Sequence, residues 1–393
     1  MTQPSTANAA TDQQFQRELN RRSFLGDAVA ASLGCMTATT LVRSAQAASA
    51  EPSVHTVLGP VPAAKLGAVL MHEHAPLIDW SELYETKTAR FESKREEILS
   101  SATRQLQRFH ESLSASEGPG AIVECTPIRV GRYPELLREL AGRLPLHVIG
   151  CTGFWGEGLA PPHRWAVRLS LQERGVAKIA DLYVREITEG MEDPSGEWGE
   201  RFTDVKAGVI KCATSSYMRP VERRCHLAAA IASKQTGCPI TTHTTGGGGL
   251  EEIELFLKQG VSPEKVIIGH QGHRDDRQQD DAAEYHRRIV ASGCFIQFDR
   301  VGSDNYSPKK TARQIRRLVE AGFARQILVS HDSAPCFYEG FSTEEKPVEG
   351  WKFEEADYTI VTTDLVSALK VEGLSEADVH AILVANPQRV LAF

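Results

Sequence analysis

The sequence lacks the features that mark several common classes of protein. Beyond its N-terminal segment it has no run of about 18 apolar residues, so nothing there is predicted to span a membrane. Acidic side chains outnumber basic ones by 51 to 44, and the absence of a basic stripe argues against a nucleic-acid partner. No Gly-x-Gly-x-x-Gly motif opens the first expected helix, which disfavours a dinucleotide-binding fold.

Cysteine is present, but without the pattern of a disulfide framework. The chain has 8 cysteines in 393 residues, and one of them, Cys35, lies in the N-terminal segment. The other seven lie within or beside apolar runs: Cys125, Cys151, Cys212, Cys225, Cys238, Cys294 and Cys336. An odd number without framework spacing predicts no disulfide, and none is paired with a histidine at zinc-finger spacing. We therefore expect seven free, buried thiols with a structural role.

The first 47 residues are predicted to be an export signal. The paired arginines of Arg21–Gly26 precede a mildly apolar stretch, Ala28–Val42, and Ala45-Gln46-Ala47 supplies the small residues of a cleavage site. This pattern resembles a twin-arginine signal, which directs folded proteins to the twin-arginine export machinery of the bacterial inner membrane. The sequence thus predicts a periplasmic protein in which residues 48–393 form one domain, with no membrane attachment after cleavage.

Eight short apolar runs, rich in Val and Ile, recur with helical patterns between them. Such continuously apolar runs are typical of parallel strands that are buried on both faces. They are Ala68–Met71, Ala121–Glu124, Leu146–Thr152, Ala207–Ala213, Pro239–Thr244, Val266–Gly269, Cys294–Asp299 and Gln326–Ser330. Eight strand–helix units predict an α/β fold of the (β/α)8 type, a TIM barrel, with its chemistry on the loops after the strands. A doubly wound open sheet is the structural alternative.

Residue types that bind divalent metals stand at the ends of these runs. His72 and His74 are two apart after the first run, so both side chains project to one face of the strand. His243 and His270 each follow a later run, and Asp332 follows the last. A carboxylate at that point could both bind a metal ion and accept a proton from bound water. We expect these side chains to converge on one metal site.

Lys211 is the unusual member of the set, because it lies inside a predicted strand between Ile210 and Cys212. Burial disfavours the charged form of a lysine, and a neutral amine is reactive. Taken alone, the residue could equally be a Schiff-base lysine or half of a buried ion pair. Its occurrence with four histidines and an aspartate favours a role at the metal site.

The ordered set resembles the phosphotriesterase family of the amidohydrolase superfamily, over nearly all of the chain after the export signal. The residues that carry this resemblance are His72-Glu73-His74, Lys211, His243, His270 and Asp332. Supporting stretches are Thr56–Pro60, Cys151–Trp155 and Asn386-Pro387. The resemblance implies two divalent metal ions bridged by a carbamate that carbon dioxide forms on Lys211.

The same resemblance implies which ligands bind each of the two ions. It assigns His72, His74 and Asp332 to a buried ion, and His243 and His270 to a more exposed one. A hydroxide that bridges both ions would attack the substrate, since two cations lower the pKa of bound water and stabilise charge in the transition state. Lys211 and Asp332 thereby become catalytic candidates. The ligand types admit zinc, manganese, cobalt or iron, and we expect zinc.

Three further residues bear on the substrate. Phe298–Gly302 resembles the Asp-Arg-aromatic-Gly stretch of the phosphotriesterase-like lactonase branch, which makes Arg300 a catalytic and substrate-binding candidate. Trp155 stands at the aromatic position that packs near the lactone ring in that branch, although a strand-end tryptophan is also compatible with a plain pocket wall. His273 stands where the family usually has an aspartate, and we expect it beside Arg300 in the substrate site. The aromatic-rich segment Pro335–Asp357 is expected to shape the pocket.

Three functions are compatible with these residues. The resemblance favours a metal-dependent hydrolase of lactones or related esters, with promiscuous phosphotriesterase activity on small-molecule substrates. A dedicated organophosphate (aryldialkylphosphate) hydrolase is the alternative, which the His273 change and the long last loop suggest. A non-catalytic exported metal-binding protein is the third. The resemblance also suggests a homodimer.

Overall fold

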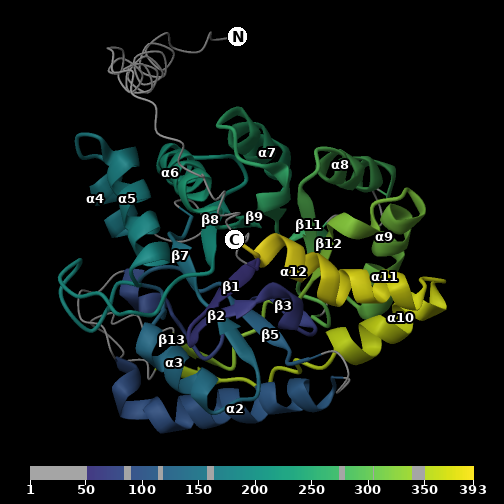
Figure 1. Cartoon of the computed structure of the whole chain (residues 1–393), viewed down its shortest axis with the longest axis horizontal. Helices are drawn as coiled ribbons and strands as arrows, with labels where there is room; N and C mark the ends of the chain where they lie inside the picture. The colour runs from purple at the N-terminus through teal and green to yellow at the C-terminus, as the bar shows by residue number, and fades with distance from the viewer. Residues whose placement is uncertain are drawn as a thin grey trace, which may run out of the picture. The chain divides into compact units, whose positions relative to one another are not determined.

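A strand lies at each of the eight positions predicted from the sequence (Figure 1). In chain order they are β3 (Val69–Glu73), β5 (Ala121–Glu124), β6 (His147–Ile149) with β7 (Cys151–Gly153), β8 (Val209–Thr214), β9 (Ile240–Thr244), β10 (Val266–Ile268), β11 (Phe295–Phe298) and β12 (Ile327–Val329). The computed structural model describes residues 51–83, 90–113, 118–156, 163–273, 279–303, 305–338 and 350–393. The predicted export signal, with Cys35, therefore lies outside the described residues.

One of the eight predicted strands was wrong in detail. The run Leu146–Thr152 is two short strands, β6 and β7, with Gly150 between them. The reason is a change of partner, because β6 pairs with β5 whereas β7 pairs with β8. The carbonyl of Gly150 accepts a hydrogen bond from the Gly208 backbone N–H at 2.8 Å, at the point where pairing passes to the β8 side.

The strands close into a barrel. β7 to β12 form a six-stranded parallel sheet, and β3, β5 and β6 form a three-stranded one. β6 and β7 join the sheets on one side. On the other side β12 lies beside β3, where the backbone N–H of Asp332 donates to the carbonyl of His72 at 3.0 Å. This closure confirms the predicted (β/α)8 fold and excludes an open sheet.

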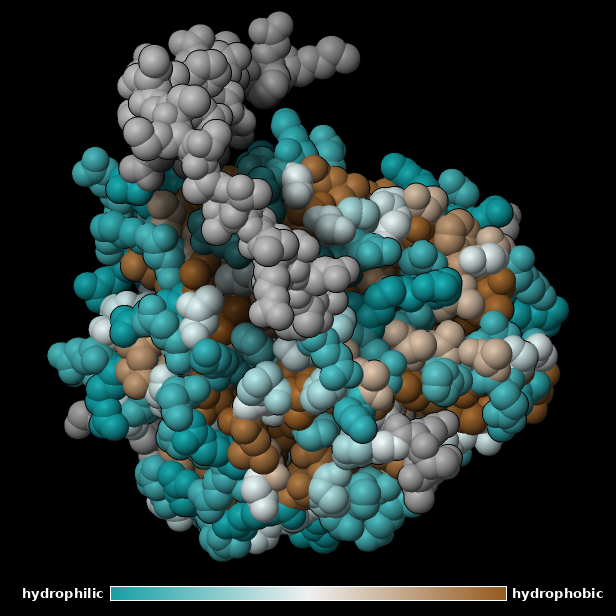
Figure 2. Space-filling model, in the orientation of Figure 1, coloured by the Kyte–Doolittle hydropathy of each residue, from teal (hydrophilic) through white to brown (hydrophobic). Residues whose placement is uncertain are grey.

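Helices surround the strands in an outer ring (Figure 1). The α-helices are α2 (Arg95–Glu111), α3 (Pro134–Gly142), α4 (Arg164–Ser170), α5 (Gly175–Thr188), α6 (Pro220–Thr236), α7 (Gly249–Lys258), α8 (Gln279–Ala291), α9 (Pro308–Glu320), α10 (Val366–Val371), α11 (Glu376–His380) and α12 (Asn386–Leu391). On the face shown in Figure 2, hydrophilic residues cover most of the outer helices and hydrophobic ones appear mainly in recesses between them. Among the described residues, no helix has the length and apolar character needed to cross a membrane.

Side chains alternate between the barrel interior and the outer helices. On β8, Val209 packs with interior residues, whereas Ile210 and Cys212 pack in the layer under the helices. Lys211 therefore projects into the barrel interior, where it is fully buried. All seven cysteines of the described part are free and buried, as predicted. The interior is closed at its base by the β1–β2 hairpin (Ser53–Thr56 and Gly59–Pro62) and α12, which share its apolar cluster.

The loops at the opposite end of the barrel carry a small sheet of their own. β13 (Cys336–Tyr338) and β14 (Trp351–Phe353) form an antiparallel hairpin, and β13 also pairs with β4 (Ile78–Asp79) in the loop after β3. The hairpin belongs to the segment Pro335–Asp357 that was predicted to shape the pocket. Residues 339–349 of that segment lie outside the described part.

Candidate metal centre

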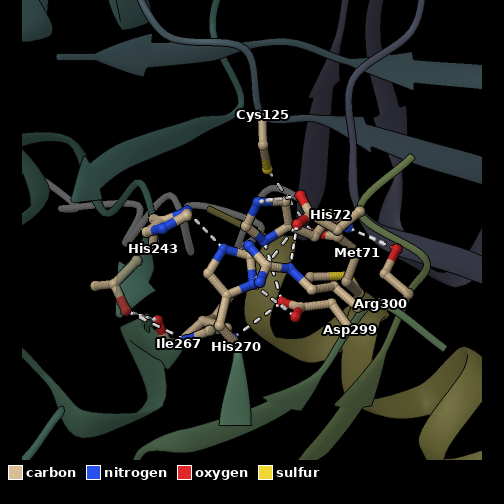
Figure 3. A network of polar contacts seen from close by, with 12 residues as sticks. Met71, His72, Cys125, His243, Ile267, His270, Asp299 and Arg300 are labelled. Carbon is tan, nitrogen blue, oxygen red and sulfur yellow. Dashed lines mark hydrogen bonds and ion pairs between the residues drawn. The ribbon is translucent and has the colours of Figure 1, made fainter. Parts of the chain in front are cut away.

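The structure brings together all six predicted metal ligands. Four lie in or directly after β3, β8 and β9: His72, His74, Lys211 and His243. His270 follows β10 and Asp332 follows β12. His72, His243 and His270 point toward one another in the barrel mouth (Figure 3). Five strands that are far apart in the sequence thus contribute to one cluster, as the strand-end pattern predicted.

The first group of close contacts surrounds Asp332. Its Oδ1 lies 3.2 Å from His74 Nε2 and 3.6 Å from His72 Nε2. The same His72 nitrogen lies 2.5 Å from Lys211 Nζ. His72, His74 and Asp332 each offer a ligand atom within 4.8 Å of the others, which is a spacing that suits one metal ion.

The second group contains His243 and His270. His270 Nε2 lies 2.6 Å from His243 Nδ1, and the two rings meet edge to face with centroids 4.1 Å apart. His270 Nδ1 lies 3.9 Å from Asp332 Oδ2, which links this group to the first. The two halves that the family resemblance implied are therefore adjacent in space.

Burial favours the neutral form of three of these histidines, His72, His74 and His243, and the neutral form is the one that binds metals. Burial lowers the pKa of His72 to about 3, with help from the charge of Lys211. Burial also lowers the pKa of His74, and burial with His270 and Lys211 lowers that of His243. Asp332 behaves oppositely: burial works against its charge, but the surrounding histidines outweigh burial and hold its pKa well below the ordinary value.

Three residues of the site occupy the left-handed region of the backbone, which non-glycine residues rarely adopt. They are His270, Arg300 and Asp332, with φ of 59°, 63° and 57°. Each stands just after a barrel strand, so the turn redirects a side chain at the barrel mouth. Such strain persists only where the surrounding structure enforces it, and it is common at functional sites.

A bulge in β3 helps to aim the first histidine pair. Leu70 pairs with Ile122 and Glu73 with Glu124, so β3 holds one residue more than its partner between these pairs. His72 lies within this irregularity, and its backbone N–H donates to Ser330 Oγ at 2.8 Å. Beyond it, His74 Nδ1 contacts Thr126 Oγ1 at 3.0 Å, which leaves Nε2 facing Asp332.

Sequence reasoning assigned no role to Asp299, which the structure places in the cluster. This buried carboxylate lies 2.6 Å from His270 Nδ1 and 3.3 Å from His72 Nδ1. His72, His270 and Asp299 also form a second group of potential ligands within 4.8 Å. The signal that could have found Asp299 is the one used for the others, since it is a polar residue that ends an apolar strand.

Arg300 contacts the metal-ligand set directly. Its Nε donates to Asp332 Oδ2 at 2.7 Å. Burial lowers the pKa of this guanidinium, but the charge and hydrogen bond of Asp332 outweigh that effect and raise it. The side chain of His273, predicted beside Arg300, lies outside the described part. The neighbouring His331 lies with its Nδ1 3.0 Å from Glu73 Oε1, and its Nε2 accepts from the Val361 backbone N–H at 3.2 Å.

An aromatic wall flanks the His243 side of the cluster. The Trp155 ring lies 4.8 Å from the His243 ring and 5.3 Å from the Trp80 ring, centroid to centroid. Both tryptophans and Phe337 of β13 pack against a small apolar cluster of Ile78, Leu83, Val130 and Ala334. The Trp155 Nε1 has no hydrogen-bond partner among the described residues. The wall is therefore a half-buried apolar surface next to the candidate ligands.

Fold and site together define a class: a (β/α)8 barrel with a histidine, lysine and aspartate cluster at the C-terminal ends of its strands. The chain belongs to the phosphotriesterase family, whose model matches residues 52–391. It is 30% identical to a phosphotriesterase homology protein of Mycobacterium tuberculosis, over 86% of this chain and 97% of that protein. It is 27% identical to the aryldialkylphosphatase of Saccharolobus solfataricus, over 82% of this chain and 94% of that enzyme.

A solved structure agrees with this assignment. A mutant of a phosphotriesterase-like lactonase from Deinococcus radiodurans superposes with a TM-score of 0.70 and 28% identity, over 86% of this chain and 99% of that one. The named enzymes among these relatives are hydrolases, but their names give different substrates. The family therefore supports a hydrolase and leaves the substrate to be argued from the site.

Proposed function

We propose that the protein is a binuclear metal-dependent hydrolase that opens lactones or related esters and hydrolyses phosphotriesters more slowly. The observation that carries the proposal is the convergence of six ligand-type side chains, from five strand ends, around Asp332 and His270. A purely structural core does not require imidazoles, a carboxylate and a lysine in mutual contact. These groups lie at the barrel mouth, where this fold carries its chemistry.

The donor set fits two divalent ions. His72, His74 and Asp332 would hold one ion, and His243 and His270 the other, with a carbamate on Lys211 shared by both. Imidazole and carboxylate donors suit zinc, and also manganese, cobalt or iron. When bound, the ions would supply Lewis-acid activation of the substrate oxygen and of a water nucleophile.

The protein's own residues would then orient the substrate and accept a proton. Asp332 is held as an anion by its histidine neighbours, so it can accept a proton at its carboxylate. Arg300 engages Asp332 Oδ2 and fixes the direction of that carboxylate. Trp155 and Trp80 would cover the apolar part of a substrate and exclude water from the His243 side. His273 stays a proposed substrate contact.

A dedicated organophosphate hydrolase is the second candidate. The aryldialkylphosphatase relative favours it, and so does the histidine at position 273 in place of the family's usual aspartate. A non-catalytic metal-binding role is a third reading, which an inert but metal-loaded protein would support. These three readings share the metal site and differ in turnover.

The deciding experiment compares kcat/KM on purified, metal-loaded protein lacking residues 1–47. A chain-length series of lactones is set beside an aryl dialkyl phosphate. We expect the lactones to be the better substrates. A triester rate above every lactone rate would replace the first proposal by the second, and no turnover of any substrate would favour the third.

We also propose, from the N-terminal sequence pattern, that the protein is exported by the twin-arginine route to the periplasm, and, from the family resemblance, that it forms a homodimer. Cell fractionation before and after replacement of Arg21 and Arg22 by lysine tests the route. Light scattering of the purified protein tests the dimer.

A further inference from the structure

β11 contributes none of the six predicted ligands, although it lies between β10 and β12, which lead to His270 and Asp332. It ends at Phe298, and the next residue is Asp299, whose side chain is fully buried. A buried carboxylate is costly unless it is hydrogen-bonded or paired, so its partners indicate its role.

The partners of Asp299 belong to different halves of the metal centre. Asp299 Oδ1 lies 2.6 Å from His270 Nδ1, and Oδ2 accepts from the His270 backbone N–H at 3.1 Å. Asp299 Oδ2 also lies 3.3 Å from His72 Nδ1. The contact with His72 is longer than the contact with His270, and it falls outside hydrogen-bond geometry.

Both histidines therefore use one ring nitrogen for Asp299 and turn the other toward the cluster. His72 Nε2 faces Lys211 Nζ and Asp332 Oδ1, and His270 Nε2 faces His243 Nδ1. Figure 3 shows Asp299 beside His270, with His243 on the opposite side of that imidazole. One carboxylate is in contact with the two imidazoles that the proposed function assigns to separate ions.

We propose that Asp299 is a positioning residue shared by both halves of the metal centre, and that it couples the binding of the two ions. The proposal rests on the proposed function for the existence of two ions. Asp299 holds the proton of each imidazole on Nδ1, which leaves the Nε2 lone pair for the metal and raises its basicity. Because the same carboxylate contacts both rings, ordering one imidazole also orders Asp299 beside the other.

The principal test is Asp299→Asn, which preserves shape but offers one acceptor oxygen in place of two. Apo protein is titrated with zinc by calorimetry, and anomalous diffraction gives the occupancy of each metal position at limiting zinc. We expect two ions in the unmodified protein, and affinities for both that fall about 10- to 100-fold in the variant. The larger fall is expected for the ion bound by His270.

Glu252→Gln is the matched control. Glu252 is another fully buried carboxylate beside a buried histidine, since its Oε1 lies 3.5 Å from His226 Nε2, but neither residue is a predicted ligand. The control is expected to keep both zinc affinities. Equal losses in the control, or a loss at only one metal position in Asp299→Asn, would overturn the coupling.

A measurement on the unmodified protein covers the case in which Asp299→Asn does not fold. Long-range ¹H–¹⁵N correlation spectra of the zinc-loaded protein report which ring nitrogen carries the proton. The proposal requires a protonated Nδ1 and a metal-bound Nε2 in both His72 and His270. A metal-bound Nδ1 in either ring would make Asp299 a ligand or a bystander, and would overturn the proposal.

The failure of this inference is distinct from failure of the proposed function. Two ions bound without hydrolysis of any substrate would refute the function but leave the Asp299 test valid. Fewer than two ions in the unmodified protein would refute both.

Discussion

At the scale of single residues, the site depends on side chains whose ordinary behaviour is altered by burial. Burial lowers the pKa of His72 and His243, whereas Asp332 keeps its charge among the histidines. Lys211 lies at the centre with its Nζ in contact with His72, and it is fully buried. Replacing Lys211 should therefore be the most informative test of the metal centre.

Lys211→Met should remove the second metal ion and most of the activity. Methionine keeps a similar volume, so a packing defect contributes little, but it cannot form a carbamate or bind as the amine would. We expect kcat/KM to fall by about 100-fold or more, since losing a ligand should cost more than losing its supporting partner. Elemental analysis counts the bound metal, and reconstitution of the unmodified apo protein should be faster with added bicarbonate. Full metal content and activity in the variant would contradict the assigned role.

Glu82 provides a residue-scale prediction outside the ligand set. It is buried in a 3-10 turn. Its carboxylate accepts a hydrogen bond from Tyr133 Oη at 2.5 Å and one from the Gly131 backbone N–H at 2.8 Å. Burial, and then the charge of Asp79, raise its pKa from 4.5 to about 8. Between these values the folded state binds the proton that the unfolded state has lost. The contribution of Glu82 is therefore present below about pH 4.5 and is lost as pH rises through about 8.

Glu82→Gln removes this titration while keeping a hydrogen-bonding side chain. We expect its free energy of unfolding to decline less than that of the unmodified protein between pH 5.5 and 8.5, by about 1–3 kcal/mol. Urea unfolding at fixed metal concentration measures both profiles. Parallel profiles would show that Glu82 is already ionised in the folded protein.

At the scale of elements, the strand ends matter more than the strands. Three of the barrel strands, β10, β11 and β12, lead to a residue with a left-handed backbone, and these turns aim His270, Arg300 and Asp332. The backbones of β7 and β8 approach each other closely beside Lys211. Gly153 of β7 pairs with Lys211 of β8, and a Cβ at Gly153 would lie 1.9 Å from the Lys211 carbonyl oxygen.

Gly153→Ala should therefore disrupt the barrel next to Lys211. Gly153 has φ of 120°, which a side chain rarely adopts, and the clash is with backbone that cannot move aside cheaply. We expect a loss of about 3 kcal/mol or more in the free energy of unfolding. Gly142→Ala is the control, because Gly142 ends α3 and a Cβ there meets nothing within 4 Å. It should be neutral or stabilise by about 0.5–1 kcal/mol, as measured by thermal unfolding.

The elements also show which parts of the fold and site could be predicted from the sequence. Apolar runs located the eight strand positions, and the His, Lys and Asp residues in or after five of these runs are the ones that the structure gathers. The division at Gly150 was missed because an apolar run does not record a change of strand partner. The bulge at His72 and the left-handed turns at His270 and Arg300 were missed because the residues at these positions are neither glycine nor proline. Asp299 was passed over because a carboxylate's role depends on which rings lie beside it.

At the scale of the whole molecule, the metal centre lies across the seam where the barrel closes. β3 carries His72 and His74, and Asp332 follows β12 on the other side of the seam. Glu73, fully buried between them, accepts from Ser330 Oγ at 2.7 Å and from the backbone N–H groups of His331 and Ser333 at 2.9 and 3.0 Å. Ligands from both sides of the seam would make metal binding part of barrel closure.

Metal removal should consequently lower the thermal stability of the whole barrel. An ion that binds only the folded state stabilises it by about 2.7 kcal/mol when its concentration is 100 times the dissociation constant, and the second ion adds to this. We expect treatment with a chelator to lower Tm by several degrees, with recovery on adding zinc. Calorimetry at fixed protein concentration, with bound metal counted before and after, measures the effect. In Lys211→Met the chelator should act less, because less metal is bound. An unchanged Tm in protein that has demonstrably lost both ions would mean that Glu73 and its backbone partners close the seam without help from the metal centre.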